Sequence, residues 1–180
     1  MKITEIFMQG PLVIEPQVFR DTRGYFFESY NKDKFINAGI TDEFVQDNQS
    51  LSQKGAIRGL HFQAPLFAQG KLVRVAIGAV NDVIVDIRKN SPTYGRHYSI
   101  LLTGENNTML WIPPGFAHGF ETLEDNTLFL YKCTNLYNKQ SEGGLLFNDE
   151  ELNINWVEKN PIVSEKDMLL PRLKDFVSPF

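Results

Sequence analysis

Short apolar runs separated by turn residues fill the chain from about residue 40 to residue 137. Leu72–Ile77 is one such run, and Val80–Ile87 is another, followed by turn residues at Ser91–Gly95. Apolar side chains at alternate positions are typical of strands that bury one face. Many such strands, with a turn about every ten residues, predict an all-β sandwich or barrel. No repeat or linker interrupts the pattern, so we expect one domain over residues 1–180.

The N-terminal region predicts an arm and a short helix. Residues 11–30 alternate apolar and polar side chains around a turn at Asp21–Gly24, which favours a β-hairpin. A helix is expected over Asn31–Ala38, because Asn31 can cap its start and the following glycine can end it. A barrel with an N-terminal hairpin arm is the simplest architecture that contains these elements.

The C-terminal third changes from strands to short helices. Phe120–Leu123 and Thr127–Thr134 predict two strands that pair across an Asp-Asn turn. Beyond them, Asp149–Leu152 and Glu165–Leu169 have the spacing of single helical turns, and nearby prolines prevent longer helices. The expected fold is therefore an all-β barrel with an N-terminal hairpin arm and short C-terminal helices.

Composition and charge narrow the classes of partner. Hydrophobic residues make up 42% and charged residues 22% of the 180 residues, which is ordinary globular composition. The net charge of −4 argues against a nucleic-acid binder but permits a small anionic ligand. The single cysteine, Cys133, excludes an internal disulfide and fits a reducing compartment. No apolar run is long enough for a signal peptide or a membrane span, so we expect a cytoplasmic protein without a membrane partner.

Two of the three histidines lie in an altered two-part barrel motif. The first part contains His61 and Gln63, and the second part ends at His118. The pattern resembles the metal-binding motif of the cupins, a class of small jelly-roll barrels, in which His-x-His is followed by Glu. Here Gln63 stands at the second histidine and Lys71 lies where the acidic ligand is expected. An amide and an ammonium cannot replace these ligands around a divalent cation, so we expect no metal and no cofactor.

The remaining side chains suit acid–base chemistry on an organic anion. His61 is a candidate base, Lys71 a cation that can stabilise an enolate oxygen, and Tyr131 a candidate proton donor. The structural alternatives are a core histidine bonded to a carbonyl, a solvated lysine at a strand end, and a tyrosine with its hydroxyl at the surface. Arg58, Lys71 and His118 fall on candidate strands near His61, which favours a site.

Asp167 admits two interpretations. In Ser164-Glu165-Lys166-Asp167, Ser164 can cap a helix and Asp167 occupies the third helical position, so capping alone would explain the carboxylate. Alternatively, Asp167 is the carboxylate that orients His61. The sequence leaves both open.

Five further polar residues lie near strand-like segments. Each one alone is typical of a solvated surface, although the two arginines could hold phosphates bidentately. These residues are Arg23, Glu28, Gln46, Asn48 and Arg58.

Seven stretches in order along the chain resemble the dTDP-4-dehydrorhamnose 3,5-epimerase family. Together they extend from about Phe19 to Asp167, so the resemblance covers nearly the whole chain. The stretches are Asp21–Glu28, Val45–Asn48, Arg58–Gln63, Gln69–Val75, Val85–Arg88, Trp111–Phe120 and Tyr131–Thr134.

The resemblance implies a metal-free jelly-roll homodimer that acts on a dTDP-linked 4-keto-6-deoxyhexose. By motif, His61 is the base held by Asp167, Tyr131 is the acid, and Lys71 steadies the enolate. The resemblance also implies that the hairpin crosses to the other subunit, that Tyr137 stacks on thymine and that Lys166 contacts the diphosphate. The residues implied to line the nucleotide and sugar site are Arg23, Glu28, Gln46, Asn48, Arg58, His118 and Glu142.

Three functions remain open at this point. The first is inversion at both C3 and C5, giving dTDP-4-dehydro-L-rhamnose. The second is inversion at one carbon, or action on a differently decorated nucleotide sugar, which the motif residues do not separate from the first. The third is a non-catalytic barrel that binds a sugar or nucleotide; loss of His61 or Tyr131 would mark it, and both are present.

Overall fold

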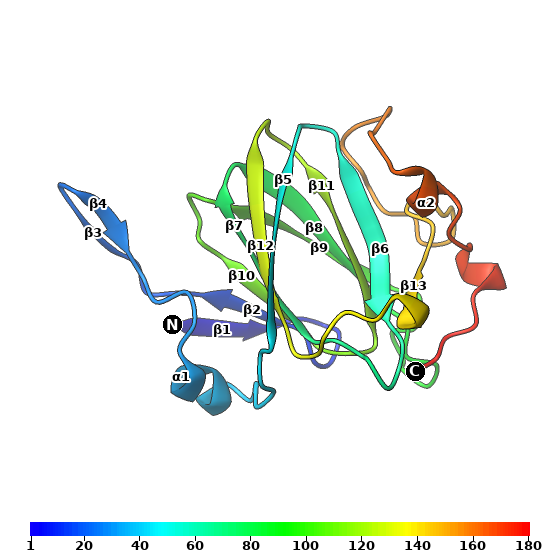
Figure 1. The fold of residues 1–180 in the computed structure, drawn as a ribbon, viewed down its shortest axis with the longest axis horizontal. Helices are drawn as coiled ribbons and strands as arrows, with labels where there is room; N and C mark the ends of the chain where they lie inside the picture. The colour runs from blue at the N-terminus through cyan, green and yellow to red at the C-terminus, as the bar shows by residue number, and fades with distance from the viewer.

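The computed structural model describes residues 1–180, and strands dominate it (Figure 1). Two antiparallel sheets face each other, as expected for the jelly-roll barrel. In order, the six-stranded sheet contains β1 (Lys2–Glu5), β2 (Leu12–Glu15), β10 (Met109–Ile112), β7 (Lys71–Ile77), β12 (Thr127–Cys133) and β5 (Gln46–Ser52). The five-stranded sheet contains β13 (Glu142–Gly144), β6 (Ile57–Gln63), β11 (Phe116–Thr122), β8 (Ala79–Asp86) and β9 (His97–Thr103).

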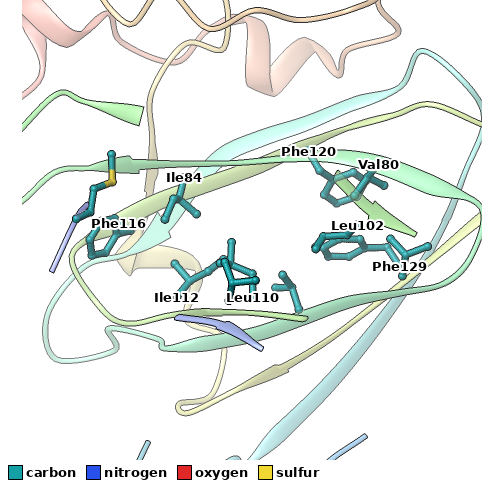
Figure 2. Close-up of a cluster of buried hydrophobic side chains, with 12 residues drawn as sticks. Val80, Ile84, Leu102, Leu110, Ile112, Phe116, Phe120 and Phe129 are labelled. Atoms are coloured by element: carbon teal, nitrogen blue, oxygen red, sulfur yellow. The ribbon is translucent and has the colours of Figure 1, made fainter. Parts of the chain in front are cut away.

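The core between the sheets is a cluster of 12 buried apolar side chains (Figure 2). Val80 and Ile84 on β8 point inward, and so do Val73 and Val75 on β7, as the period of two requires. Phe129 is stacked on another ring of the cluster, with 4.2 Å between the centroids. This cluster fills one part of the barrel and leaves the space beside it to polar side chains.

Two more apolar clusters cover the outer faces of the sheets. Outside the five-stranded sheet, Leu60 and Phe62 pack with the C-terminal tail, including Phe176 and Phe180. Outside the six-stranded sheet, Leu72 and neighbouring side chains pack against the region around α1 (Lys32–Asn37). The tail therefore closes one face of the barrel and helix α1 closes part of the other.

The N-terminal arm and helix are present where the sequence predicts them. Strands β3 (Phe19–Asp21) and β4 (Gly24–Phe26) pair with each other and project away from the barrel (Figure 1). The hairpin is shorter than expected, because the residues of β2 pair with β1 and β10 instead. The Asn31 side chain accepts the N–H of Lys34 at 3.2 Å, which confirms it as the cap of α1.

The predicted pairing of Phe120–Leu123 with Thr127–Thr134 is wrong. Strand β11 pairs with β6 and β8, whereas β12 pairs with β5 and β7 in the other sheet. The turn between them therefore joins the two sheets at a corner of the barrel. A local alternation pattern identifies two strands, but it cannot show to which sheet each belongs.

One of the two helical turns predicted for the tail is present. Helix α2 (Glu165–Met168) forms as expected, and two 3₁₀ turns, η1 (Lys139–Ser141) and η2 (Leu173–Asp175), were not anticipated. Asp149–Leu152 is an irregular turn, in which the Asp149 carboxylate accepts the N–H groups of Glu151 and Leu152 at 2.7 and 3.3 Å. A carboxylate bonded to its own following backbone competes with a helix, which explains this difference.

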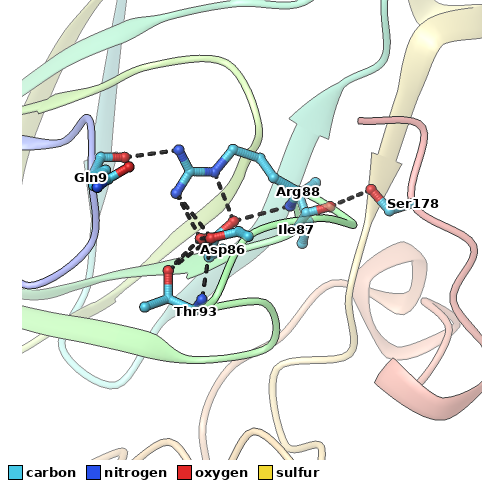
Figure 3. Close-up of polar contacts among 7 residues, drawn as sticks. Gln9, Asp86, Ile87, Arg88, Thr93 and Ser178 are labelled. Atoms are coloured by element: carbon cyan, nitrogen blue, oxygen red, sulfur yellow. Dashed lines mark hydrogen bonds and ion pairs between the residues drawn. The ribbon is translucent and has the colours of Figure 1, made fainter.

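A polar network joins both ends of the chain to the barrel (Figure 3). Arg88 donates to both oxygens of buried Asp86, at 2.9 and 2.7 Å, and to the carbonyl of Gln9 at 2.8 Å. Burial would raise the pKa of Asp86, but the hydrogen bonds from Arg88, Ser91 and Thr93 lower it below its usual value. On the next residue, the carbonyl of Ile87 accepts the Ser178 hydroxyl. No helix in the structure has the length and apolar character needed to cross a membrane.

Candidate active site

Strand alternation turns a set of polar side chains into the barrel, where they line a cavity of about 540 Å³. The cavity is lined by both sheets and by α2, so its residues come from distant parts of the sequence. The predicted site residues that line it are Arg58, His61, Lys71, His118, Tyr131, Lys166 and Asp167. All four predicted catalytic residues therefore face one space.

A second hollow of about 290 Å³ adjoins the first. His61, Lys71 and Tyr131 line both, so the two spaces meet at these three side chains. The second hollow also brings together four residues predicted to bind substrate: Gln46, Asn48, Tyr137 and Glu142. The two adjoining hollows together form a cleft, in which all four predicted catalytic residues line one part and these four polar residues line the other.

His61 and Asp167 form the most direct interaction in the cavity. His61 Nε2 lies 2.8 Å from Asp167 Oδ1, and the exposed fractions of the two side chains are 29% and 6%. The second carboxylate oxygen accepts the Gly59 N–H at 3.3 Å. With Nε2 bonded to Asp167, the Nδ1 edge of the imidazole is the one free to accept a proton. The structure therefore excludes the alternative of a core histidine bonded to a backbone carbonyl.

Capping does not explain the Asp167 carboxylate, although Ser164 does cap helix α2 as expected. The Ser164 hydroxyl accepts the backbone N–H of Asp167 at 3.1 Å, so Ser164 caps the helix. The Asp167 side chain is not used for capping and turns inward to His61. Burial would raise the pKa of Asp167, but its hydrogen bond to His61, the charge of that ring and its bonds to Gly59 and Ser164 lower it. Asp167 is consequently an ionised partner for His61.

Gly59 permits the close approach of β6 to β11 beside His61. Its φ of +127° lies in a region that side chains rarely adopt. A Cβ at this position would lie 2.5 Å from Gly119 Cα and 2.8 Å from the carbonyl oxygen of His118. A glycine is therefore required where the two histidine-bearing strands are adjacent, with His61 opposite His118 in the register.

Lys71 lies inside the barrel, not at a solvated strand end. Burial lowers the pKa of its ammonium, and the charges of Cys133, Asp82 and Glu142 oppose that shift. No hydrogen bond contributes to its pKa. A lysine that lines the cavity without a hydrogen-bond partner remains available to an anionic oxygen of a bound molecule.

Tyr131 lines the cavity from the sheet opposite His61. His61 is on β6 of the five-stranded sheet and Tyr131 is on β12 of the six-stranded sheet. Burial raises the pKa of the Tyr131 phenol, and the charge of Arg58 acts against this shift. The phenol is consequently protonated at neutral pH, and the alternative of a hydroxyl at the outer surface is wrong.

His118 is buried and paired with Asp82, a residue that sequence reasoning missed. His118 Nε2 lies 2.9 Å from Asp82 Oδ2, and both side chains are almost fully buried. Asp82 lies between inward-facing Val80 and Ile84 on β8. A carboxylate among the inward positions of an apolar strand was the signal that could have identified it.

Three predicted residues form a chain of contacts at the rim. The Tyr137 hydroxyl donates to Glu142 Oε2 at 2.9 Å, and Lys166 Nζ lies 2.5 Å from Glu142 Oε1. Burial would raise the pKa of Glu142, but these two partners lower it, and Glu142 in turn raises the pKa of Lys166. Lys166 is thus a cation at the mouth of the cavity, where phosphates can compete for it.

Gln46, Asn48 and Arg58 are held by neighbouring polar groups. Gln46 donates to Asn48 at 3.1 Å and accepts the Tyr137 N–H at 3.0 Å. Arg58 donates through Nε to the Ser52 hydroxyl at 3.0 Å, and no acidic side chain pairs with its guanidinium. These three side chains are positioned before any ligand arrives, which lowers the entropic cost of binding one.

Arg23 and Glu28 do not reach the cavity of their own chain. Arg23 is bonded to Asp21 at the tip of the hairpin, and its side chain is 88% exposed. Glu28 is bonded to Lys34 and Asn31. Within one chain, these two residues are the only predicted site residues that the fold does not bring to the cleft.

The sequence also missed several lining residues that are not charged. Phe120 and Phe129 form one wall, and Ile162 and Val163 border the cavity near α2. The hydroxyl of Ser50, which also lines the cavity, is buried without a hydrogen-bond partner. Apolar and hydroxyl side chains of this kind are common in any strand or loop, so only the fold reveals their place.

The altered barrel motif leads to a prediction about metal removal. No three His, Cys, Asp or Glu side chains gather around a common point. Gln63 is buried and accepts the Asn138 N–H at 3.0 Å, so its amide is already used. We expect exhaustive chelation with EDTA to leave turnover unchanged, because imidazole, ammonium and phenol supply the chemistry. Loss of turnover with EDTA and recovery with Zn²⁺ or Mn²⁺ would contradict this expectation.

Comparisons with known proteins agree with this geometry. A family model described as dTDP-4-dehydrorhamnose 3,5-epimerase matches residues 5–175. A dTDP-4-dehydrorhamnose 3,5-epimerase of Salmonella typhimurium is 54% identical over 166 residues, which cover 90% of each chain. The protein of the same description from Shigella flexneri is 50% identical over 169 residues, 93% of each chain. A crystal structure of dTDP-6-deoxy-D-glucose-3,5-epimerase from Legionella pneumophila, in complex with dTDP-4-keto-L-rhamnose, is 43% identical with a TM-score of 0.94, covering 98% of this chain and 94% of that one.

Proposed function

This chain belongs to the dTDP-4-dehydrorhamnose 3,5-epimerase family, and we propose that it inverts C3 and C5 of dTDP-4-dehydro-6-deoxy-D-glucose to give dTDP-4-dehydro-L-rhamnose. It is an isomerase whose single epimerase domain spans residues 1–180. The observation that carries the proposal is the His61–Asp167 pair, at 2.8 Å, in one cavity with Lys71 and Tyr131.

His61 removes the proton from carbon. The C4 ketone makes the hydrogens on C3 and C5 acidic, because the resulting carbanion is delocalised onto O4. Asp167 holds the ring through Nε2, so Nδ1 takes the proton and Asp167 stabilises the imidazolium that forms.

Lys71 stabilises the enolate. As the C–H bond breaks, its electron pair forms the C=C bond and negative charge develops on O4. An ammonium without another hydrogen-bond partner, in a partly apolar cavity, interacts with that charge more strongly than it would in water.

Tyr131 returns a proton from the other side. Because His61 and Tyr131 come from opposite sheets, a sugar between them presents opposite faces to the two groups. The Tyr131 phenol protonates the carbon, the enolate collapses to the ketone, and the carbon is inverted. Exchange with solvent resets both groups before the second carbon reacts.

Polar and charged side chains of both hollows bind the nucleotide. Arg58 and Lys166 supply positive charge for the diphosphate, and Tyr137 offers an exposed ring for stacking on thymine. Gln46, Asn48, Glu142 and His118 supply hydrogen-bonding groups for the nucleoside and the sugar. Phosphate oxygens compete with Glu142 for Lys166, so nucleotide binding frees that carboxylate.

We further propose that the active form is a homodimer. The hairpin projects from the barrel with Phe19 and Phe26 exposed by 56% and 66%, which is unusual for free apolar side chains. Arg23 and Glu28 on this arm lie away from their own cavity. An arm that crosses to the partner buries these rings and carries both residues to the partner's cleft. We also propose a cytoplasmic location, which the unpaired Cys133 supports.

Complementation between inactive variants tests the crossing arm. Arg23→Ala and His61→Ala each remove a residue of one site, and in a mixed dimer one site would contain both intact residues. We expect each variant alone to be impaired and a 1:1 mixture, after exchange of subunits, to recover about a quarter of wild-type activity. Sedimentation velocity checks the dimer. A mixture no more active than its components would contradict a shared site.

Isotope incorporation tests the reaction itself. The protein is incubated with dTDP-4-keto-6-deoxyglucose in deuterated water, and NMR counts the labelled carbons in the product. Inversion at two carbons places deuterium at both C3 and C5. Label and inversion at a single carbon would identify a single-carbon epimerase instead, and the absence of both would point to a non-catalytic binding barrel.

A further inference from the structure

Asp82 has one carboxylate oxygen without a partner. The residue is 0% exposed and lies on the inner face of β8. Its Oδ2 lies 2.9 Å from His118 Nε2, whereas Oδ1 is buried and makes no hydrogen bond. Other buried carboxylates of this chain are fully bonded: Glu121, for example, accepts the backbone N–H groups of Val157 and Glu158 at 2.8 and 2.5 Å.

A buried carboxylate with one unbonded oxygen lowers the stability of the folded protein unless a positive charge lies near it. Lys71, on the facing sheet, is the matching feature, since it lines the cavity and its ammonium has no hydrogen-bond partner. Asp82 is one of the anionic groups whose charge favours the ammonium form of Lys71. One unbonded carboxylate oxygen and one unpaired ammonium therefore lie on facing sheets of the barrel.

We propose that Asp82 is a positioning residue for the epimerisation: one oxygen holds the His118 ring, and the carboxylate charge keeps Lys71 an ammonium within the barrel. The proposal rests on the proposed function, because Lys71 must be cationic to stabilise the enolate. Without Asp82, the desolvation of Lys71 would favour the neutral amine, which cannot supply positive charge to O4.

Several titratable groups face Lys71, and among them only the anionic ones favour its ammonium form. On the neighbouring strand β12, Cys133 is directly opposite Lys71 in the register, and Tyr131 lines the same cavity as Lys71. Strand β10, on its other side, places Ile112 opposite Lys71 and contributes no charge. The other titratable groups that face Lys71 come from the five-stranded sheet and from α2. They are Arg58 and His61 on β6, Asp82 on β8, His118 on β11, Glu142 on β13, and Lys166 and Asp167 on α2.

The sign of the expected effect follows from these charges. Removing an anion near Lys71 disfavours the ammonium, so the pKa of Lys71 falls. We expect its titration midpoint in Asp82→Asn to move to lower pH by about one unit, and the alkaline limb of kcat to move with it. In the falling part of that limb, one unit corresponds to about a tenfold loss of kcat.

The test combines an NMR titration of the lysine ¹³Cε signals with the pH profile of kcat. The Lys71 signal is identified as the one missing from the spectrum of Lys71→Arg. Asp82→Ser provides a second neutral variant should the Asn variant fold poorly. Asp86→Asn is the matched control, since it removes a buried carboxylate from the same strand outside the cleft. We expect Asp86→Asn to lower stability and leave the Lys71 midpoint unchanged.

The outcomes separate this inference from the proposed reaction. Two results together support the positioning role. The Lys71 midpoint moves to lower pH in both neutral Asp82 variants, and the alkaline limb of kcat does not move when Asp82→Asn is made in the Lys71→Arg background. An unchanged midpoint in the folded variants overturns it, even if kcat falls. An inactive wild-type chain would contradict the proposed function. The NMR titration does not depend on turnover, so the Lys71 midpoint would still decide whether Asp82 acts on Lys71.

Discussion

Replacing His61 with alanine is expected to reduce kcat by about 10²- to 10⁴-fold, the range that a positioned general base supplies. The imidazole is oriented by the buried Asp167 through a 2.8 Å contact and is 29% exposed, whereas the other imidazole of the cavity, His118, is almost fully buried. Its loss leaves Lys71 and Tyr131 in place but removes the acceptor for the carbon-bound proton. Steady-state kinetics with the nucleotide-linked ketosugar measure the effect.

Binding of dTDP should change little in the same variant, because the proposed partner of His61 is the sugar, which dTDP lacks. Calorimetric titration with dTDP checks this. His97→Ala is the matched control: His97 is on β9 and lines neither hollow of the cleft, so its removal should leave kcat near the wild-type value. Near-normal turnover in His61→Ala would overturn the assignment of the base.

Tyr131→Phe is expected to separate proton removal from inversion. The phenylalanine retains the ring that packs against Phe129, 6.1 Å away between centroids, but it has no proton to donate. Net epimerisation should fall by about 10²-fold or more, whereas exchange of the first carbon-bound hydrogen with solvent should fall much less, because His61 still acts. NMR in deuterated water follows both processes in one sample.

The matched control for this variant is Tyr98→Phe. Tyr98 packs against the core cluster from β9 and does not border the cleft, so loss of its hydroxyl should affect neither process. An equal loss of exchange and inversion in Tyr131→Phe would argue that the phenol is not the acid. Wild-type rates of both exchange and inversion in Tyr131→Phe would also argue that the phenol is not the acid.

Much of the local structure follows from local rules. The cap of α1 at Asn31, the turn at the tip of the hairpin and the alternation within β7 and β8 each depend on residues a few positions apart. The same alternation explains why Lys71 points inward with Val73 and Val75. Local patterns failed at Asp149–Leu152, where a carboxylate bonded to the backbone prevents a helical turn.

The sequence by itself determined the kind of chemistry that this protein can perform. The chain supplies an imidazole, a phenol and an ammonium, and its barrel motif has lost two of the expected metal ligands. These identities do not depend on how the strands are arranged. Seven ordered stretches likewise identified the family, because side-chain identity at many separated positions is a property of the chain alone.

Only the tertiary structure decided which of these groups face one another. His61 and Asp167 are 106 positions apart, and His118 and Asp82 are 36 apart, so no local period relates them. Their contacts arise because the register of β6, β11 and β8, and the docking of the tail across the barrel, bring the strands and α2 together. The assignment of β11 and β12 to different sheets was decided in the same way, since strand pairing depends on burial and register across the whole barrel.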